Sequence, residues 1–252
     1  MDERMDVSFY ENIYSNIDRG DIRSVSELEA GTSAALDLNY RVLLPESSSA
    51  RILDVGCGWG YLLHYLKKRG YSNIEGIDSS HHSRRLNFIK DTLKIDAVGI
   101  EKVEDYLNAN KGKYDLIVMQ QVIYYFKRED LPVIMKAAYD ALRPGGRIIV
   151  EVFNGSLLTS VFVQGWDYER TMIFTEFSLA EILIDSGFKL MDISGMKTPP
   201  EMRFRSRMRR MAQDAWLFIL KCIYMLERGK DPVLVPRIYA KHLIAVAEKR
   251  SA

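Results

Sequence analysis

RILDVGCGWG, residues 51–60, is a short apolar run that ends in three glycines spaced as G-x-G-x-G. The apolar part is typical of a buried strand. Residues 61–69 follow with helical spacing, and Gly70 stands where a C-terminal glycine cap belongs. A strand, a glycine turn and a helix in this order predict a parallel α/β sheet whose turn binds a ligand.

Outward from this turn, strand and helix signals alternate along the chain. Further strands are expected at Asn73–Ile77, Ala97–Ile100, Tyr114–Met119, Arg147–Phe153, Leu190–Ser194 and His242–Ala247. The pattern predicts a Rossmann-like α/β fold with a seven-stranded, mostly parallel sheet and helices on both faces. Residues 197–236 return the chain beside the strand that it leaves, so the last strand is expected to be antiparallel.

No linker divides the sequence, so residues 1–252 are predicted to form a single domain. Residues 1–50 are interpreted as an N-terminal helical lid, with a break expected at Gly31. Residues 51–199 would form the ligand-binding core. Residues 200–252 would add a basic amphipathic helix and the last strand.

Composition and charge exclude several classes of function. The formal net charge is +1, which argues against a nucleic-acid partner. Two cysteines are too few for a disulfide framework. Apolar runs fall short of the roughly 18 residues that cross a bilayer, and the first residues are charged. A cytoplasmic location is therefore expected.

Two kinds of ligand compete for the glycine turn, a dinucleotide and S-adenosylmethionine. The dinucleotide fingerprint G-x-G-x-x-G needs a third glycine where this chain has Tyr61, which disfavours a pyrophosphate site. Asp78 ends the second expected strand, where a carboxylate can accept hydrogen bonds from both ribose hydroxyls. A helix N-cap is the structural alternative for Asp78.

Four segments in order resemble the motifs of class I S-adenosylmethionine-dependent methyltransferases. They are Ile52–Gly60, Gly76–Asp78, Tyr114–Val118 and Leu142–Gly146. The similarity covers about residues 50–195. The later stretch Phe174–Leu179 resembles the branch that includes ubiquinone-pathway and surface-glycan (sugar) O-methyltransferases.

The resemblance implies a role for each matching position. Asp54, Gly56, Cys57, Gly58 and Gly60 would hold the methionine end of S-adenosylmethionine. Asp78 and Ser79 would hold the ribose, Val103 and Glu104 the adenine, and Gln120 the methionyl amine. No metal is expected, because His81 and His82 lack a third ligand at a convincing spacing.

A hydroxyl acceptor must also lose its proton, because its pKa lies far above 7. The candidate bases are Tyr125 and Glu151, which stand where the fourth and fifth strands end, and one of His64, His81 or His82. Tyr125 could instead form an aromatic wall, and Glu151 could pair with a nearby arginine. His64 lies inside a predicted helix and is interpreted as structural.

The acceptor is expected to contact aromatic and basic residues late in the chain. Trp166, Tyr168 and Phe174 offer flat surfaces that can stack on a sugar ring. Arg203, Arg205 and Arg207 belong to an arginine cluster before an amphipathic helix. The cluster could be a solvated helix start, bind a phosphorylated or lipid-linked acceptor, or contact an anionic inner-membrane surface.

Together these features predict a methyltransferase that uses S-adenosylmethionine to methylate a sugar or glycan hydroxyl in surface-polysaccharide synthesis. A quinone-like or other small molecule is the alternative acceptor. A non-enzymatic, cofactor-binding scaffold module is an alternative of a different class.

Overall fold

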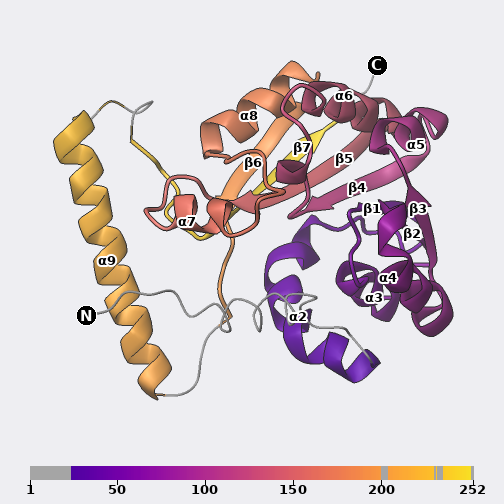
Figure 1. The fold of residues 1–252 in the computed structure, drawn as a ribbon, viewed down its shortest axis with the longest axis horizontal. Helices are drawn as coiled ribbons and strands as arrows, with labels where there is room; N and C mark the ends of the chain where they lie inside the picture. Colours follow the sequence, from indigo (N-terminus) through magenta and orange to yellow (C-terminus); the bar gives the residue numbers. More distant parts are fainter. Residues whose placement is uncertain (1–23, 200–203, 230, 232–234, 251–252) are drawn as a thin grey trace.

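The computed structural model describes residues 24–199, 204–229, 231 and 235–250, without the side chains of residues 30–33 and 204–207. A seven-stranded sheet forms its centre, in the order β3-β2-β1-β4-β5-β7-β6 (Figure 1). The strands are β1 (Arg51–Val55), β2 (Asn73–Ser79), β3 (Asp96–Ile100), β4 (Tyr114–Gln120), β5 (Leu142–Phe153), β6 (Lys189–Gly195) and β7 (His242–Glu248). Strands β1 to β5 pair in parallel, and β7 is antiparallel to both β5 and β6. The predicted sheet and its antiparallel last strand are confirmed.

Helices cover both faces of the sheet (Figure 1). One face carries α2 (Val25–Tyr40), α3 (Tyr61–Lys68) and α4 (Ser83–Phe88), and the other carries α5 (Val103–Ala109), α6 (Leu131–Ala141) and α8 (Glu176–Asp185). Short turns complete the connections: η1 (Arg41–Leu43), η2 (Ser80–His82), the π-helical η3 (Ile89–Leu93) and η4 (Ile123–Tyr125). Alternate strand residues enter two separate apolar cores, as Leu116 and Ile117 do in β4. Burial on both faces explains why these strands are almost entirely apolar.

The described part of the N-terminal lid differs from the sequence prediction, because α2 continues through Gly31. An interior glycine costs a helix only about 1 kcal/mol relative to alanine. Leu28, Leu36 and Tyr40 of α2 are buried against the body of the protein. Their packing offsets the cost of the glycine, so the predicted break is wrong.

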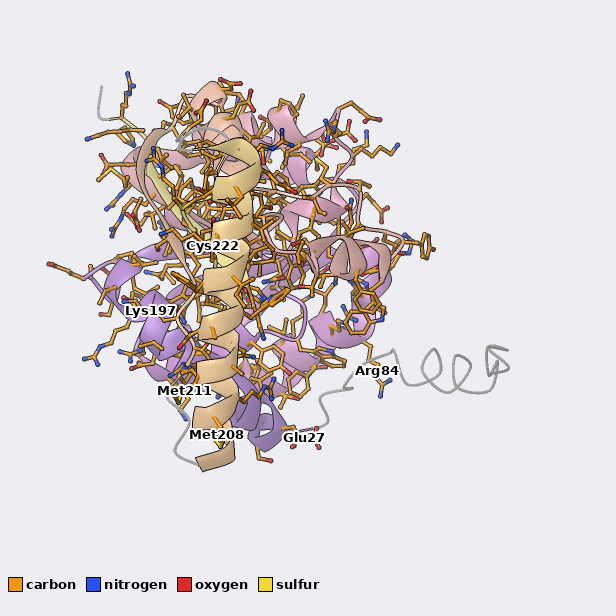
Figure 2. The ribbon with its side chains drawn as sticks, turned by 90° about the vertical axis from the view of Figure 1, so that its left-hand side faces the viewer. Glu27, Arg84, Lys197, Met208, Met211 and Cys222 are labelled. Carbon is orange, nitrogen blue, oxygen red and sulfur yellow. The ribbon has the colours of Figure 1, made fainter. Side chains whose placement is uncertain are left out.

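Two further helices lie on one side of the molecule, the short α7 (Ser160–Gly165) and the long α9 (Phe204–Arg228) (Figure 1). Helix α9 is attached through buried Leu220 and through Tyr224, whose hydroxyl donates a hydrogen bond to the Ser156 carbonyl at 2.9 Å. Figure 2 looks onto α9 from outside, with Met208, Met211 and Cys222 along it. Within the described residues, none of the helices is long and apolar enough to cross a membrane.

Gly76 in β2 allows the sheet to approach the glycine turn closely. A Cβ atom at this position would lie 2.7 Å from Leu63 Cδ1 and 2.8 Å from Cys57 Sγ. Both neighbours are buried, so neither can move away at little cost.

We expect Gly76→Ala to lower the free energy of unfolding by about 1–3 kcal/mol, because it overpacks this contact. Urea denaturation followed by circular dichroism measures the change. Gly165→Ala is the matched control, since nothing lies within 4 Å of a Cβ there. Equal stabilities for the two variants would contradict the close approach at Gly76.

Candidate active site

The glycine turn between β1 and α3 is held against β2 by two backbone hydrogen bonds. The amides of Gly56 and Cys57 donate to the Ile77 carbonyl at 2.8 and 3.1 Å. Gly56 has φ +74°, and a Cβ there would lie 2.5 Å from Val122 Cγ2. Gly58 has φ +53°, with nothing within 4 Å of the place where a Cβ would stand. The turn therefore presents bare backbone to open space, as close approach of a ligand requires.

Asp78 is fixed at the end of β2, facing this turn. Its Oδ2 accepts a hydrogen bond from the Gly58 amide at 2.7 Å, and its Oδ1 accepts one from the Ser79 amide at 2.7 Å. His82 Nδ1 lies 2.9 Å from Oδ1. The described residues contain no group of three His, Cys, Asp or Glu side chains that could hold a metal ion. A carboxylate held in this way suits ribose hydroxyls, and the ribose role of Asp78 and Ser79 stays a prediction.

Asp54 is the last residue but one of β1, beside the glycine turn, and is only 2% exposed. Burial raises the pKa of its carboxyl to about 8, and the negative charge of Asp78 adds to the increase. A cation bound nearby would relieve both effects. The methionine end of S-adenosylmethionine carries an ammonium and a sulfonium, so the carboxylate pair and the open turn fit this cofactor. Burial likewise raises the pKa of Cys57, whose thiol is therefore unsuited to act as a nucleophile.

The other residues assigned to the cofactor lie at the same edge of the sheet. Val103 and Glu104 begin α5 directly after β3, which pairs with β2. Gln120 ends β4, and its side-chain amide donates to Glu151 Oε2 at 3.0 Å. Their contacts with the cofactor stay predictions, although the fold brings all of them to the carboxyl ends of neighbouring strands.

Glu151 is almost completely buried at the end of β5 and accepts four hydrogen bonds. Its Oε2 is bound by the Tyr40 hydroxyl (2.5 Å) and by Gln120, and its Oε1 by Gln121 Nε2 (2.7 Å) and His242 Nδ1 (2.9 Å). Burial alone would raise the pKa of this carboxyl, but the hydrogen bonds outweigh it and the pKa lies below its usual range. Glu151 as the base stays a prediction, although four donors to an ionised carboxylate lower its basicity.

Tyr125, the second predicted base, lies in η4 after β4. Its hydroxyl donates to Asp167 Oδ2 at 2.8 Å. Burial raises the pKa of this phenol, although the Arg170 guanidinium opposes the shift. A protonated phenol that already donates a hydrogen bond is poorly suited to remove a proton. Its predicted catalytic role is untested, and its ring contacts Tyr124 at 4.9 Å between centroids, as an aromatic wall would.

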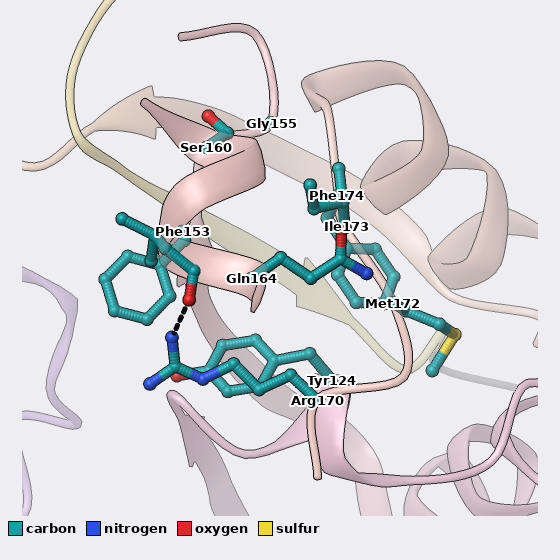
Figure 3. Close-up of a pocket in the computed structure, with 10 residues that line it drawn as sticks. Tyr124, Phe153, Gly155, Ser160, Gln164, Arg170, Met172, Ile173 and Phe174 are labelled. Carbon is teal, nitrogen blue, oxygen red and sulfur yellow. Dashed lines mark hydrogen bonds between the residues drawn. The ribbon is translucent and has the colours of Figure 1, made fainter. Parts of the chain in front are cut away.

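A cavity opens where β4 and β5 end (Figure 3). Its lining consists of Tyr124, Phe153, Gly155, Ser160, Val163, Gln164, Arg170, Met172, Ile173 and Phe174. The Arg170 guanidinium lies 5.2 Å from the centroid of the Tyr124 ring and 4.9 Å from that of Phe153. Its Nη1 donates to the Val163 carbonyl at 2.5 Å. The cavity is thus an aromatic and apolar pocket with one cation, at the edge where open α/β sheets bind ligands.

Of the aromatic residues predicted to stack on the acceptor, Phe174 lines this cavity, whereas Trp166 and Tyr168 do not. Trp166 and Tyr168 are 50% and 91% exposed. Arg203 is outside the described residues. Arg205 and Arg207 lie in α9, and their side chains are outside the described part. Acceptor binding by these residues stays a prediction.

The sequence interpretation missed two residues at this edge, His242 and Arg170. His242 begins β7, and because β7 is antiparallel, it pairs with Phe153 at the end of β5. The sequence already predicted an antiparallel last strand. Because that arrangement places the start of β7 beside the active-site edge, it could have revealed His242. Arg170 carries no such signal, because the stacking of distant aromatic rings positions it.

Comparisons with known proteins agree with this geometry. The family model described as a methyltransferase domain matches residues 29–193. The ubiquinone biosynthesis O-methyltransferase of Xylella fastidiosa is 30% identical over 175 residues, which cover 64% of this chain and 69% of that protein. The enzyme of the same description from Xanthomonas axonopodis is 26% identical over 185 residues, 68% of this chain and 75% of its own length.

Solved structures show the same fold. An S-adenosylmethionine-dependent methyltransferase from Archaeoglobus fulgidus has a TM-score of 0.62 and 18% identity, covering 95% of this chain and all of its own. Phosphoethanolamine N-methyltransferase 2 of Haemonchus contortus, solved with S-adenosyl-L-methionine, has a TM-score of 0.59 and 17% identity. That match covers 94% of this chain and 60% of the other.

The chain belongs to the methyltransferase domain family and is a class I S-adenosylmethionine-dependent methyltransferase. It resembles the ubiquinone-pathway O-methyltransferases. Because the chain is an enzyme of this family, the alternative of a non-enzymatic, cofactor-binding scaffold module is excluded.

The raised pKa of Asp54 predicts a stability that depends on pH. Between about pH 4 and pH 8 the folded protein holds a proton on Asp54 that the unfolded chain releases, so stability falls as the pH rises. Asp54→Asn removes this penalty. The variant should gain stability over wild type, on the order of 1–3 kcal/mol at pH 8.5, with a smaller gain at pH 5.

Thermal unfolding from pH 5 to pH 9 measures this difference without cofactor. Calorimetry with S-adenosylhomocysteine should show weaker binding to the Asp54→Asn variant at pH 8.5, because the ammonium loses its carboxylate partner. Asp192→Asn, on the exposed side of β6, is the control. A gain for Asp54→Asn that is constant with pH would refute the raised pKa.

Proposed function

We propose that the protein methylates a hydroxyl group on a flat, phenolic or quinone-like small molecule. The observation that carries this proposal is the lining of the cavity at the ends of β4 and β5, where aromatic and apolar side chains surround one arginine. When bound, S-adenosylmethionine supplies an electrophilic methyl group. The similarity to enzymes named for ubiquinone biosynthesis supports the same class of acceptor.

A sugar or glycan hydroxyl, the acceptor first expected from the sequence, is the second candidate. Each sugar hydroxyl removed from water needs a hydrogen-bonding partner. The cavity offers few such partners, namely Gln164, the Nε of Arg170 and the hydroxyls of Tyr124 and Ser160. Both hydroxyls already donate to other groups of the protein. Of the three aromatic residues expected to stack on the sugar, Phe174 belongs to the lining, whereas Trp166 and Tyr168 lie outside it. A phenolic ring needs fewer polar partners and so fits better.

An acceptor screen with labelled S-adenosylmethionine tests this proposal, comparing catechols and quinols with nucleotide sugars and lipid-linked glycans. We expect catechols to be methylated. Arg170→Met should raise KM for the acceptor about tenfold or more, because a charge-assisted contact is lost. Affinity for S-adenosylhomocysteine should not change.

Arg51→Met is the matched control, since Arg51 is exposed at the opposite edge of the sheet, where β1 begins. Methylation of sugars but not of catechols would overturn the proposed acceptor. An unchanged acceptor KM in Arg170→Met would remove Arg170 from the acceptor site.

We also propose that α9 binds the surface of an anionic bilayer. Its outer side exposes large apolar residues, namely Met208, Met211, Trp216, Phe218, Ile219 and Leu226. The described part of α9 adds four exposed cations, Arg209, Arg210, Lys221 and Arg228, against two acidic residues, Asp214 and Glu227. A basic helix with an apolar face is suited to lie in the headgroup region of an anionic membrane. The excess of cations favours a lipid surface over a second copy of the chain, which would bring like charges together.

Sedimentation with lipid vesicles tests the membrane contact. The protein should bind vesicles that contain phosphatidylglycerol, bind pure phosphatidylcholine less, and dissociate as salt is added. Phe218→Ser combined with Leu226→Ser should weaken binding about tenfold or more. Val133→Ser, exposed on α6, is the control. The proposal would be contradicted if the protein did not bind vesicles, or if it formed a dimer that dissociates only in the double variant.

A further inference from the structure

The group best placed to accept a proton from the substrate lies beside Glu151. All four hydrogen bonds to the Glu151 carboxylate come from protein donors, and the side chain is 2% exposed. A carboxylate in this state would have to give up a donor before it could take a proton. The His242 side chain, by contrast, is 26% exposed at the edge of the sheet.

The hydrogen bonds determine which nitrogen of His242 carries the proton. The Tyr124 hydroxyl donates to Gln121 Oε1 at 2.7 Å, so the Gln121 amide nitrogen faces Glu151 and donates to Oε1. His242 Nδ1 lies 2.9 Å from the same oxygen and 2.9 Å from Gln121 Nε2. The ionised carboxylate can only accept a hydrogen bond and is the stronger partner, so Nδ1 carries the proton and donates it to Oε1. Nε2 then remains unprotonated and is the basic nitrogen of the ring.

The position of His242 also fits a role beside the acceptor. Its ring packs edge to face on Phe153, with centroids 4.8 Å apart, and Phe153 stacks on Tyr124 at 5.6 Å. Phe153 and Tyr124 both line the cavity that we assign to the acceptor. His242 itself does not belong to the lining, but its ring packs on a side chain that does. The cofactor turn lies on the other side of β4.

We propose that His242 is the general base of the methyl transfer and that Glu151 is the residue that positions it. This inference rests on the proposed O-methylation. The acceptor O–H bond breaks, and its proton moves to His242 Nε2. The oxygen electron pair forms the new bond to the methyl carbon as the carbon–sulfur bond breaks. The imidazolium is balanced by the Glu151 carboxylate and afterwards loses its proton to water.

Catechol methylation by His242→Gln and His242→Ala tests the base. We expect kcat to fall about 10²–10⁴-fold in both variants, with little change in affinity for S-adenosylhomocysteine. Added imidazole should restore part of the activity of His242→Ala, but not of Glu151→Gln, whose histidine is present but poorly oriented. His64→Gln is the matched control, because His64 lies in α3 and is paired with Glu29 of α2.

A series of increasingly acidic acceptors separates proton removal from a structural role. The loss in His242→Gln should shrink from catechol to 4-nitrocatechol, because a more acidic hydroxyl needs less help. A loss of equal size for both acceptors, without imidazole rescue, would overturn the role of His242, as would near-normal kcat in both variants. A wild-type protein that methylates neither catechol would instead contradict the proposed function, and with it this assignment.

Discussion

The negative charge of Glu151 organises the acceptor side of the active site. Its four hydrogen-bond donors come from α2, from the end of β4 and from the start of β7. A carboxylate buried without partners would cost several kcal/mol, so each donor segment is constrained to meet at this point. The helical lid, the active-site edge of the sheet and the antiparallel strand are thereby fixed relative to one another.

The electrostatics of the cofactor side of the active site differ from those of the acceptor side. Asp54 and Asp78 place two acidic groups near each other beside an open glycine turn, and burial makes ionisation of Asp54 unfavourable. A cationic ligand bound here would relieve this cost, so the predicted cofactor role of Asp54 implies that this relief would contribute to the free energy of binding. The two halves of the site therefore differ: one is satisfied before any ligand arrives, and the other is completed by it.

The sequence alone was sufficient to predict the features that short-range patterns determine. The glycine turn, Asp78 and the succession of strands and helices along the chain could be predicted because each depends on neighbouring residues. The break at Gly31 was predicted wrongly, because the packing of α2 outweighs the low helix propensity of glycine. His242 and Arg170 escaped prediction because their positions depend on partners far along the chain. The sequence did identify Glu151 as a residue at the active-site edge, but the donors around it became visible only in the folded structure.

The partners of Glu151 also determine when the site can form during synthesis. Tyr40 precedes Glu151 by 111 residues, and His242 follows it by 91. Strand β7, which carries His242, inserts between β5 and β6 although it is synthesised after both of them. A nascent chain that has already made the cofactor turn still lacks both this strand and the histidine. Contacts of such long sequence separation form slowly, so binding of the cofactor can precede the capacity to methylate.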